Sequence, residues 1–210
     1  MLCIGVYGGH LGEKAISSIT KFCQRQQNKK VFILTSCDEP DFILSYTNAK
    51  ENDGVFLVLM KETTLSYCEK YGLFFDIILC LQAWTLLHEM STYLKTEGVI
   101  ILNSDDKKID PTKVGEQCKV ITCGLSKDAN VTISSVCESV LLERIQCCIQ
   151  DTFCTVSGTE VEPQEFSVEL DLEEKSVSGL LAAVTALMAG DMEISVLADA
   201  KGTSKEKKIE

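Results

Sequence analysis

The chain opens with Met1-Leu-Cys-Ile-Gly-Val-Tyr-Gly-Gly-His-Leu-Gly-Glu-Lys-Ala-Ile-Ser17. An apolar run over residues 2–7 leads into a glycine-rich segment and then into residues with helical spacing. A buried strand, a glycine-rich turn and a helix in this order commonly cradle a phosphate, because free backbone N–H groups and the helix N-terminus point at the anion. This stretch therefore predicts a parallel α/β sheet with an anion site at the end of its first strand.

The glycine-rich segment departs from the Walker phosphate-loop pattern, in which Gly-Lys is followed by Ser or Thr. Glu13 separates Gly12 from Lys14, and Ala15 replaces the hydroxyl residue that would hold Mg²⁺. The residues predicted to contact a phosphate or other ligand are those of the turn: Gly8, Gly9, His10, Gly12 and Lys14. Two simpler interpretations stay open: the glycines serve only a tight turn, and Lys14 is a surface residue of the first helical turn.

The first 105 residues alternate short apolar runs with helical patterns. The expected strands are residues 2–7, 31–36, 55–60, 75–81 and 99–103, and the expected helices are residues 13–27, 63–71 and 83–95. Near-continuous apolar strands are typical of a sheet that is covered on both faces. This alternation predicts a doubly wound, mostly parallel sheet with right-handed crossovers and a ligand crevice at the carboxyl ends of its strands.

The second half of the chain changes character. Residues 119–123, 130–136, 152–157 and 165–170 are expected as strands with little helix between them, which indicates a small antiparallel β extension of the main sheet. One strong helix follows over residues 176–189, with a single apolar stripe, Ser176 as its cap and Gly190 at its end. We expect one α/β domain over residues 1–190, and a short strand and flexible tail over residues 191–210.

Composition limits the classes of partner. The chain has 210 residues, 20 basic and 31 acidic, and a net charge of -11, which argues against binding to nucleic acid or to an anionic membrane. No secretory leader is evident, and the longest apolar stretch, residues 77–87, is too short to span a bilayer. We therefore expect a cytoplasmic protein.

The eleven cysteines contain no Cys-x-x-Cys spacing, so we interpret them as small hydrophobes and not as metal ligands.

Three later segments resemble the central, ATP-binding domain of the Mur ligases in order and spacing. They are Gly-Val-Ile-Ile-Leu-Asn-Ser-Asp-Asp at residues 98–106, Lys-Val-Ile-Thr-Cys-Gly-Leu at 119–125 and Asp-Ala-Asn-Val-Thr-Ile-Ser at 128–134. The helix at residues 180–187 is similar to the one that closes the same domain. Those enzymes are ATP-dependent peptide ligases of peptidoglycan synthesis, and folylpolyglutamate synthetase is related to them. The resemblance implies an ATP and Mg²⁺ site at the opening loop.

The resemblance also assigns further site residues. Glu62, just past the third strand, is the nearest match to the family's Mg²⁺ ligand, offset by one position, and its simpler interpretation is an acid at a helix N-terminus. Asp105 and Asp106 are candidates for a ribose contact, although two acids after a buried strand are also a common turn. Other motifs are missing. Residues 82–88 lack the family's Asp, residues 175–179 lack the polar residues that seat the adenine, and only nine residues separate His88 from Gly98, so the insert with the modified lysine is absent. We also expect the two flanking ligase domains to be absent.

These losses favour a noncatalytic, stand-alone Mur-ligase-like domain with no catalytic residues. We expect it to act through contacts with another protein, a ligase among the candidates, or through nucleotide binding, with ATP and Mg²⁺ bound weakly or not at all. An alternative is an ATP-dependent amide ligase component that partner chains complete. A second alternative is an NAD-dependent enzyme, since Gly8, Gly12 and Asp38 approximate a dinucleotide-binding pattern, although that fingerprint fails at Tyr7.

Overall fold

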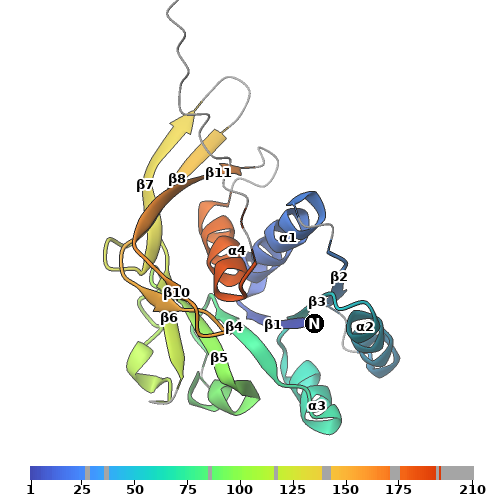
Figure 1. Ribbon diagram of the computed structural model, residues 1–210. Helices are drawn as coiled ribbons and strands as arrows, with labels where there is room; N and C mark the ends of the chain where they lie inside the picture. The colour runs from blue at the N-terminus through green and yellow to red at the C-terminus, as the bar shows by residue number, and fades with distance from the viewer. Residues whose placement is uncertain are drawn as a thin grey trace, which may run out of the picture.

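The computed structural model describes residues 1–26, 29–35, 38–84, 87–115, 118–138, 143–170, 176–192 and 194. The strand and tail expected over residues 191–210 fall largely outside these residues. The core is a nine-stranded sheet in the order β11-β8-β7-β6-β5-β4-β1-β3-β2, with a separate two-stranded ribbon, β9–β10 (Figure 1). The prediction of a mostly parallel α/β sheet with an antiparallel extension is confirmed.

The central strands of the sheet are buried on both faces, and its parallel part consists of six mainly apolar strands. They are β1 (Leu2–Tyr7), β2 (Val31–Leu34), β3 (Val55–Leu59), β4 (Phe75–Cys80), β5 (Leu94–Asn103) and β6 (Lys119–Cys123). All neighbouring pairs among these six strands are parallel. Each strand therefore ends at the same edge of the sheet, where the connections carry most of the residues that the sequence assigned to a site.

The antiparallel extension begins at β7 (Val131–Glu138), which pairs with β6 in parallel through a single register position. β8 (Glu143–Ile149) and β11 (Gln164–Leu170) then continue the sheet in antiparallel fashion. The ribbon consists of β9 (Phe153–Cys154) and β10 (Glu160–Val161). The sequence analysis missed β8, although alternate residues of this strand are buried as period-2 patterning requires.

Two helices cover each face of the sheet (Figure 1). α1 (Gly9–Gln26) and α4 (Val177–Ala189) share one hydrophobic cluster, and α2 (Glu39–Glu51) and α3 (Glu62–Tyr71) belong to the other. Short 3₁₀ segments, η1 (Leu87–Tyr93) and η2 (Pro111–Lys113), flank β5. None of the described helices is both long and apolar enough to cross a membrane.

Three helix expectations need correction. The helix expected over residues 83–95 is wrong, because Ala83 and Trp84 are not helical, η1 is a 3₁₀ segment, and β5 already begins at Leu94. The sequence analysis missed α2, where Asp38 precedes the helix and Pro40 lies in its first turn. α1 begins at Gly9, four residues before the expected start, which changes the interpretation of the opening loop.

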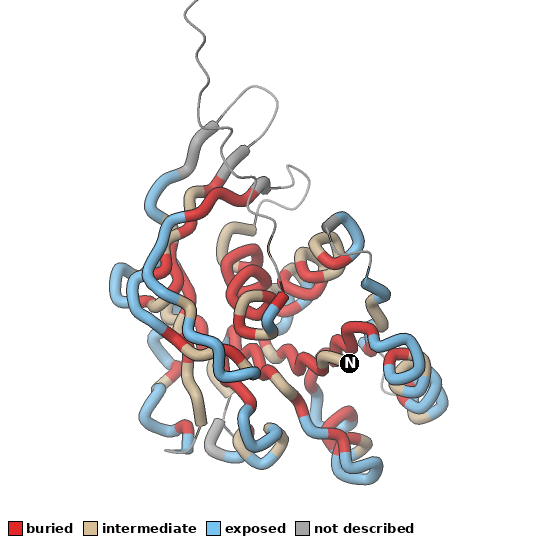
Figure 2. The backbone as a smooth tube through the Cα atoms, in the orientation of Figure 1, coloured by how far each residue is buried: buried red, intermediate tan, exposed pale blue. Residues whose placement is uncertain are grey.

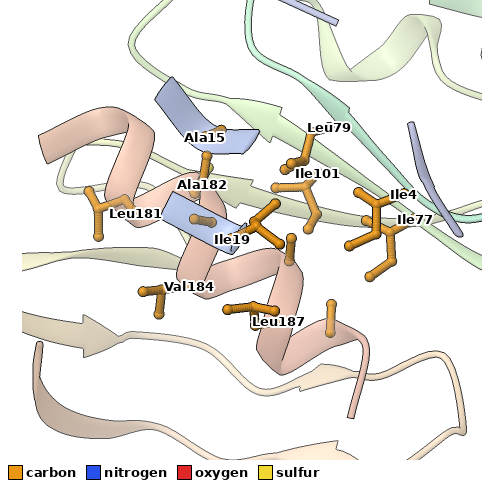
Figure 3. Close-up of a cluster of buried hydrophobic side chains, with 14 of the residues drawn as sticks. Ile4, Ala15, Ile19, Ile77, Leu79, Ile101, Leu181, Ala182, Val184 and Leu187 are labelled. Carbon is orange, nitrogen blue, oxygen red and sulfur yellow. The ribbon is translucent and has the colours of Figure 1, made fainter. Parts of the chain in front are cut away.

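α4 is the most completely buried helix. The Ser176 hydroxyl accepts a hydrogen bond from the Gly179 N–H at 3.2 Å, and Gly190 follows the last turn, so both predicted ends are confirmed. The predicted single stripe is too narrow, because residues 179–187 and Ala189 are all buried. α1, the sheet and the curved antiparallel extension enclose the helix, as the buried residues in Figure 2 and the side chains in Figure 3 show.

Truncation of one α4 side chain should measure this enclosure. Leu181 is fully buried, so Leu181→Ala should lower the free energy of unfolding by about 2–5 kcal/mol through lost contacts and a residual cavity. The matched control, Leu44→Ala, removes the same atoms from a side chain that is 62% exposed and should change stability by less than about 0.5 kcal/mol. Urea unfolding followed by circular dichroism measures both, and equal effects would contradict the packing described here.

Candidate functional site

The connection between β1 and α1 is a single residue. β1 ends at Tyr7, α1 begins at Gly9, and the Gly12 N–H already donates to the Gly8 carbonyl at 3.1 Å. The predicted loop over residues 8–14 is therefore helical from its second residue. A Walker loop encloses a phosphate with successive N–H groups of an open turn, whereas here only the free N–H groups of an ordinary helix N-terminus face the edge of the sheet.

Close packing or backbone conformation explains each of the three glycines of this segment. A Cβ at Gly8 would lie 2.7 Å from the Leu81 Cβ, and one at Gly12 would lie 3.2 Å from the Val6 Cγ1. Gly9 has φ +50, a left-handed conformation that favours glycine. The simpler interpretation of the glycines, a tight turn with close backbone approach, accounts for all three.

The other residues of this segment that bear on a ligand site divide between the surface and the core. The His10 side chain is 82% exposed, and its Nδ1 lies 3.6 Å from the Glu13 carboxylate. Ala15 is fully buried in the cluster that includes Ala182 of α4 (Figure 3). Lys14 is half-buried, and its Cβ packs against the first turn of α4, where Gly179 leaves room for it.

Glu62 and Asp105 lie at the same edge of the sheet but in different surroundings. Glu62 is the exposed first residue of α3, directly after the strand beside β1. Asp105 follows β5, and its carboxylate accepts hydrogen bonds from the N–H groups of Leu125, at 2.8 and 3.0 Å, and Ser126, at 3.1 Å. These bonds hold the β6–β7 connection. The Asp105 carboxylate thus has a structural role on the side of β5 away from Gly8.

Sequence reasoning missed a set of polar contacts that joins the strand ends. The Asn103 Nδ2 donates to the Leu81 carbonyl at 3.1 Å, and the Asp106 carboxylate accepts from the N–H of Ala83 at 2.9 Å. Backbone N–H groups of Lys108 and Ala83 lower the pKa of Asp106, because they stabilise its charged form. The sequence signal was the Asn-x-Asp-Asp pattern, whose polar residues directly follow a buried strand and can bind neighbouring backbone.

An aromatic pair completes this edge. The rings of Tyr7, the last residue of β1, and Trp84, just past β4, stack with centroids 4.4 Å apart and an interplanar angle of 13°. The pair joins the ends of two neighbouring strands on the α2–α3 face. Together, the stacked rings and the hydrogen bonds from side chains to backbone connect the strand ends at the carboxyl edge near β4.

Six of the nine cysteines whose burial the structure describes are buried, and Cys118, Cys148 and Cys154 are partly buried. Among the described residues, no three His, Cys, Asp or Glu side chains come together as a metal site would require. Burial raises the pKa of Cys80, Cys123 and Cys147 to about 12, because the low-dielectric interior disfavours the thiolate. Such thiols are poor nucleophiles and poor metal ligands at neutral pH.

Comparison with solved structures identifies the fold. MurF ligase from Thermotoga maritima in complex with ADP matches 93% of this chain with a TM-score of 0.60 at 9% identity. The UDP-N-acetylmuramoylalanyl-D-glutamyl-2,6-diaminopimelate–D-alanyl-D-alanyl ligase of Acinetobacter baumannii matches 92% of the chain with a TM-score of 0.63 at 12% identity. Folylpolyglutamate synthetase from Lactobacillus casei matches 92% with a TM-score of 0.56 at 10% identity. The chain has the fold of the Mur ligase central domain.

The likeness is one of fold and not of sequence. No family model matches the sequence, and no curated protein matches it either. The chain spans 47% of the MurF ligase from Thermotoga maritima, 44% of the Acinetobacter ligase and 59% of the folylpolyglutamate synthetase. The whole enzymes therefore contain much that this chain does not match.

The strand order bears on the dinucleotide-binding alternative. In the classic dinucleotide fold, with strand order 3-2-1-4-5-6, the second strand lies beside the first, so that the acidic residue after it reaches the ribose. In this sheet β3 lies between β1 and β2. Asp38, which follows β2, is therefore two strands away from the Gly8 turn, and the arrangement does not match that of an NAD site.

A substitution at Gly8 should test the packing at the start of α1. Gly8→Ala should destabilise the protein by about 1–3 kcal/mol, because the new Cβ meets the Leu81 Cβ at 2.7 Å. The matched control is Gly115→Ala, whose Cβ would lie 3.6 Å from its nearest neighbour and should be nearly neutral. Thermal unfolding measures both, and a neutral Gly8→Ala would show that this turn is open and not packed.

The buried thiols predict a loss of stability at alkaline pH. Burial raises the folded pKa of Cys147 from 9.0 to about 12, so between these values the unfolded chain releases a proton that the folded chain keeps. Stability should therefore fall as pH rises above 9, by up to about 1.4 kcal/mol per pH unit for each such thiol. Cys147→Ala should reduce this slope in urea unfolding at pH 8–10.5, whereas Leu44→Ala, which removes no thiol, should leave the slope unchanged.

Proposed function

We propose that this protein is a noncatalytic, cytoplasmic relative of the Mur ligase central domain that acts through contacts with other proteins. The observation that carries the proposal is the start of α1 at Gly9, which leaves one residue between β1 and the helix. Phosphoryl transfer needs a loop that positions the phosphates and groups that neutralise the developing charge. A helix that begins immediately after the strand leaves no room for such a loop.

The residues around this helix start support the same proposal. Ala15, at the position of the family's Mg²⁺-binding hydroxyl, is fully buried against α4 and cannot contact a solvated ion. Glu13 adds a negative charge near the position of the phosphates, where a carboxylate would repel a triphosphate. Asp105, the residue predicted to contact ribose, binds the backbone of Leu125 and Ser126.

Several observations support the alternative that this chain is a component of an ATP-dependent ligase. The Thermotoga MurF structure with this fold contains ADP. In this chain the free N–H groups at the start of α1 lie at the carboxyl edge of the sheet, and Lys14 lies in the second turn of that helix. Glu62 is exposed at the same edge and could bind Mg²⁺. Under this alternative, partner chains would supply the remaining catalytic groups and the substrate site.

Titration calorimetry with ATP and Mg²⁺ separates the two functions. We expect no saturable heat up to about 1 mM nucleotide, because the helix start offers only partial coordination of a triphosphate. The matched variant is Lys14→Ala, which removes the one cation of the opening segment and should leave the titration unchanged. Sub-millimolar binding that Lys14→Ala abolishes would contradict the noncatalytic proposal and support the ligase alternative.

A further inference from the structure

Within the described residues the sheet has two edge strands, and the residues beside these two strands differ in charge. β2 forms one edge and β11 forms the other. An edge strand presents unpaired N–H and C=O groups and is a template for another strand unless the protein covers or blunts it. The surroundings of these two strands determine which partner each edge can accept.

The β2 edge combines free backbone groups with an apolar groove. The Val55 N–H donates to the Lys30 carbonyl, so alternation along the strand directs the N–H and C=O groups of Val31 and Ile33 away from β3. Ile33 is 41% exposed although it lies in a strand. Beside it, a groove of about 550 Å³ runs between α1 and β2, with Ile16, Thr20 and Ile33 among its lining residues.

The charges beside the two edges are opposite. Lys29 and Lys30 are exposed directly before β2, whereas the groove beside that strand is lined by one basic and one acidic residue, Lys21 and Glu13. At the other edge, Glu160, Glu162 and Glu165 are exposed before and at the start of β11. The basic side chains and the acidic side chains therefore both lie at the N-terminal ends of their strands.

The orientation of the strands allows these two edges to meet. β11 is antiparallel to β8, which is antiparallel to β7, and β7 runs parallel to the strands that lead to β2. β11 and β2 thus run in the same direction. If the sheet of one molecule continued into the next, the two strands would form a parallel pair that places Lys29 and Lys30 beside Glu162 and Glu165.

The apolar surfaces match in the same arrangement. The groove beside β2 lies on the α1 face of the sheet, and a second groove of about 330 Å³ lies beside β11 on the same face, lined by Phe166, Met188 and Ile194 among others. In Figure 1, α1 and α4 lie on this common face, with β2 near one end of the molecule and β11 near the other. A continued sheet would bring the two grooves onto one surface.

We propose that copies of this chain associate head to tail by adding the β11 edge of one molecule to the β2 edge of the next. Such a heterologous contact does not close by two-fold symmetry, so association continues beyond the dimer, into open chains or closed rings. Symmetric alternatives do not pair these charges, because two-fold symmetry makes a β2–β2 or a β11–β11 contact antiparallel and neither contact places the lysines beside the glutamates. This inference goes beyond the proposed function and does not depend on nucleotide, so its test is carried out without ATP.

Sedimentation velocity on the full chain tests the association. At low salt and at about 0.1 mM protein, we expect the average sedimentation coefficient to rise with concentration without a plateau at the dimer. Salt at about 0.5 M should weaken the association, because it screens exposed charges. Ile33→Pro removes an outward N–H from the edge and should reduce the association at least about tenfold, whereas the matched Ile33→Val keeps the N–H and should associate like the natural chain.

A charge exchange tests which edges meet and does not depend on Ile33→Pro folding. The variants K29E/K30E and E162K/E165K should each be monomeric alone, since each places like charges at the contact. Their equimolar mixture should associate again, because every contact between different variants pairs opposite charges. Three results would each overturn the proposal: a natural chain that stays monomeric, a dimer that persists in E162K/E165K, or an equimolar mixture of the two variants that stays monomeric.

Discussion

The burial of α4 on nearly all sides is the constraint on which the rest of the structure depends. A helix with so little polar surface needs apolar neighbours on almost every side. α1 and the parallel strands supply part of this cover, and the antiparallel extension from β7 to β11 curves round to supply the rest. The second half of the chain therefore turns from parallel to antiparallel pairing in order to enclose one apolar helix.

The same constraint acts on the opening segment. Because α1 packs closely on α4, the residue at position 15 points into the shared core, and only a small apolar side chain fits there without an unpaired polar group. Gly179 has a related role on α4, since any larger residue would press on Lys14. Core packing thus determines the chemistry available at the start of α1, and Ala15 and the early helix start belong to one arrangement.

The sequence predicted the parallel core well because its strands are apolar on both faces and end at clear turn residues. The limits of β1 and β6 were predicted to the residue. β8 was missed because its alternation is weaker, with two adjacent cysteines among the alternating residues. The helix over residues 83–95 was wrongly predicted because amphipathic spacing does not reveal that Asp106 binds the Ala83 N–H and that β5 begins as early as Leu94. Tertiary contacts of this kind are not visible in local sequence.

The site was less predictable than the fold for a physical reason. Glycine, Asp and Asn at strand ends serve ligand binding and backbone connection equally well, so their presence alone does not decide between the two. The structure gives Gly8 and Gly12 close contacts and gives Asp105 backbone partners, which satisfies these residues without a ligand. The ligases with this fold share only 9–12% of its residues. Burial patterns can preserve a fold at such identity, whereas a phosphate loop requires particular residues at particular positions. Retention of the fold here is therefore no argument for retention of the chemistry.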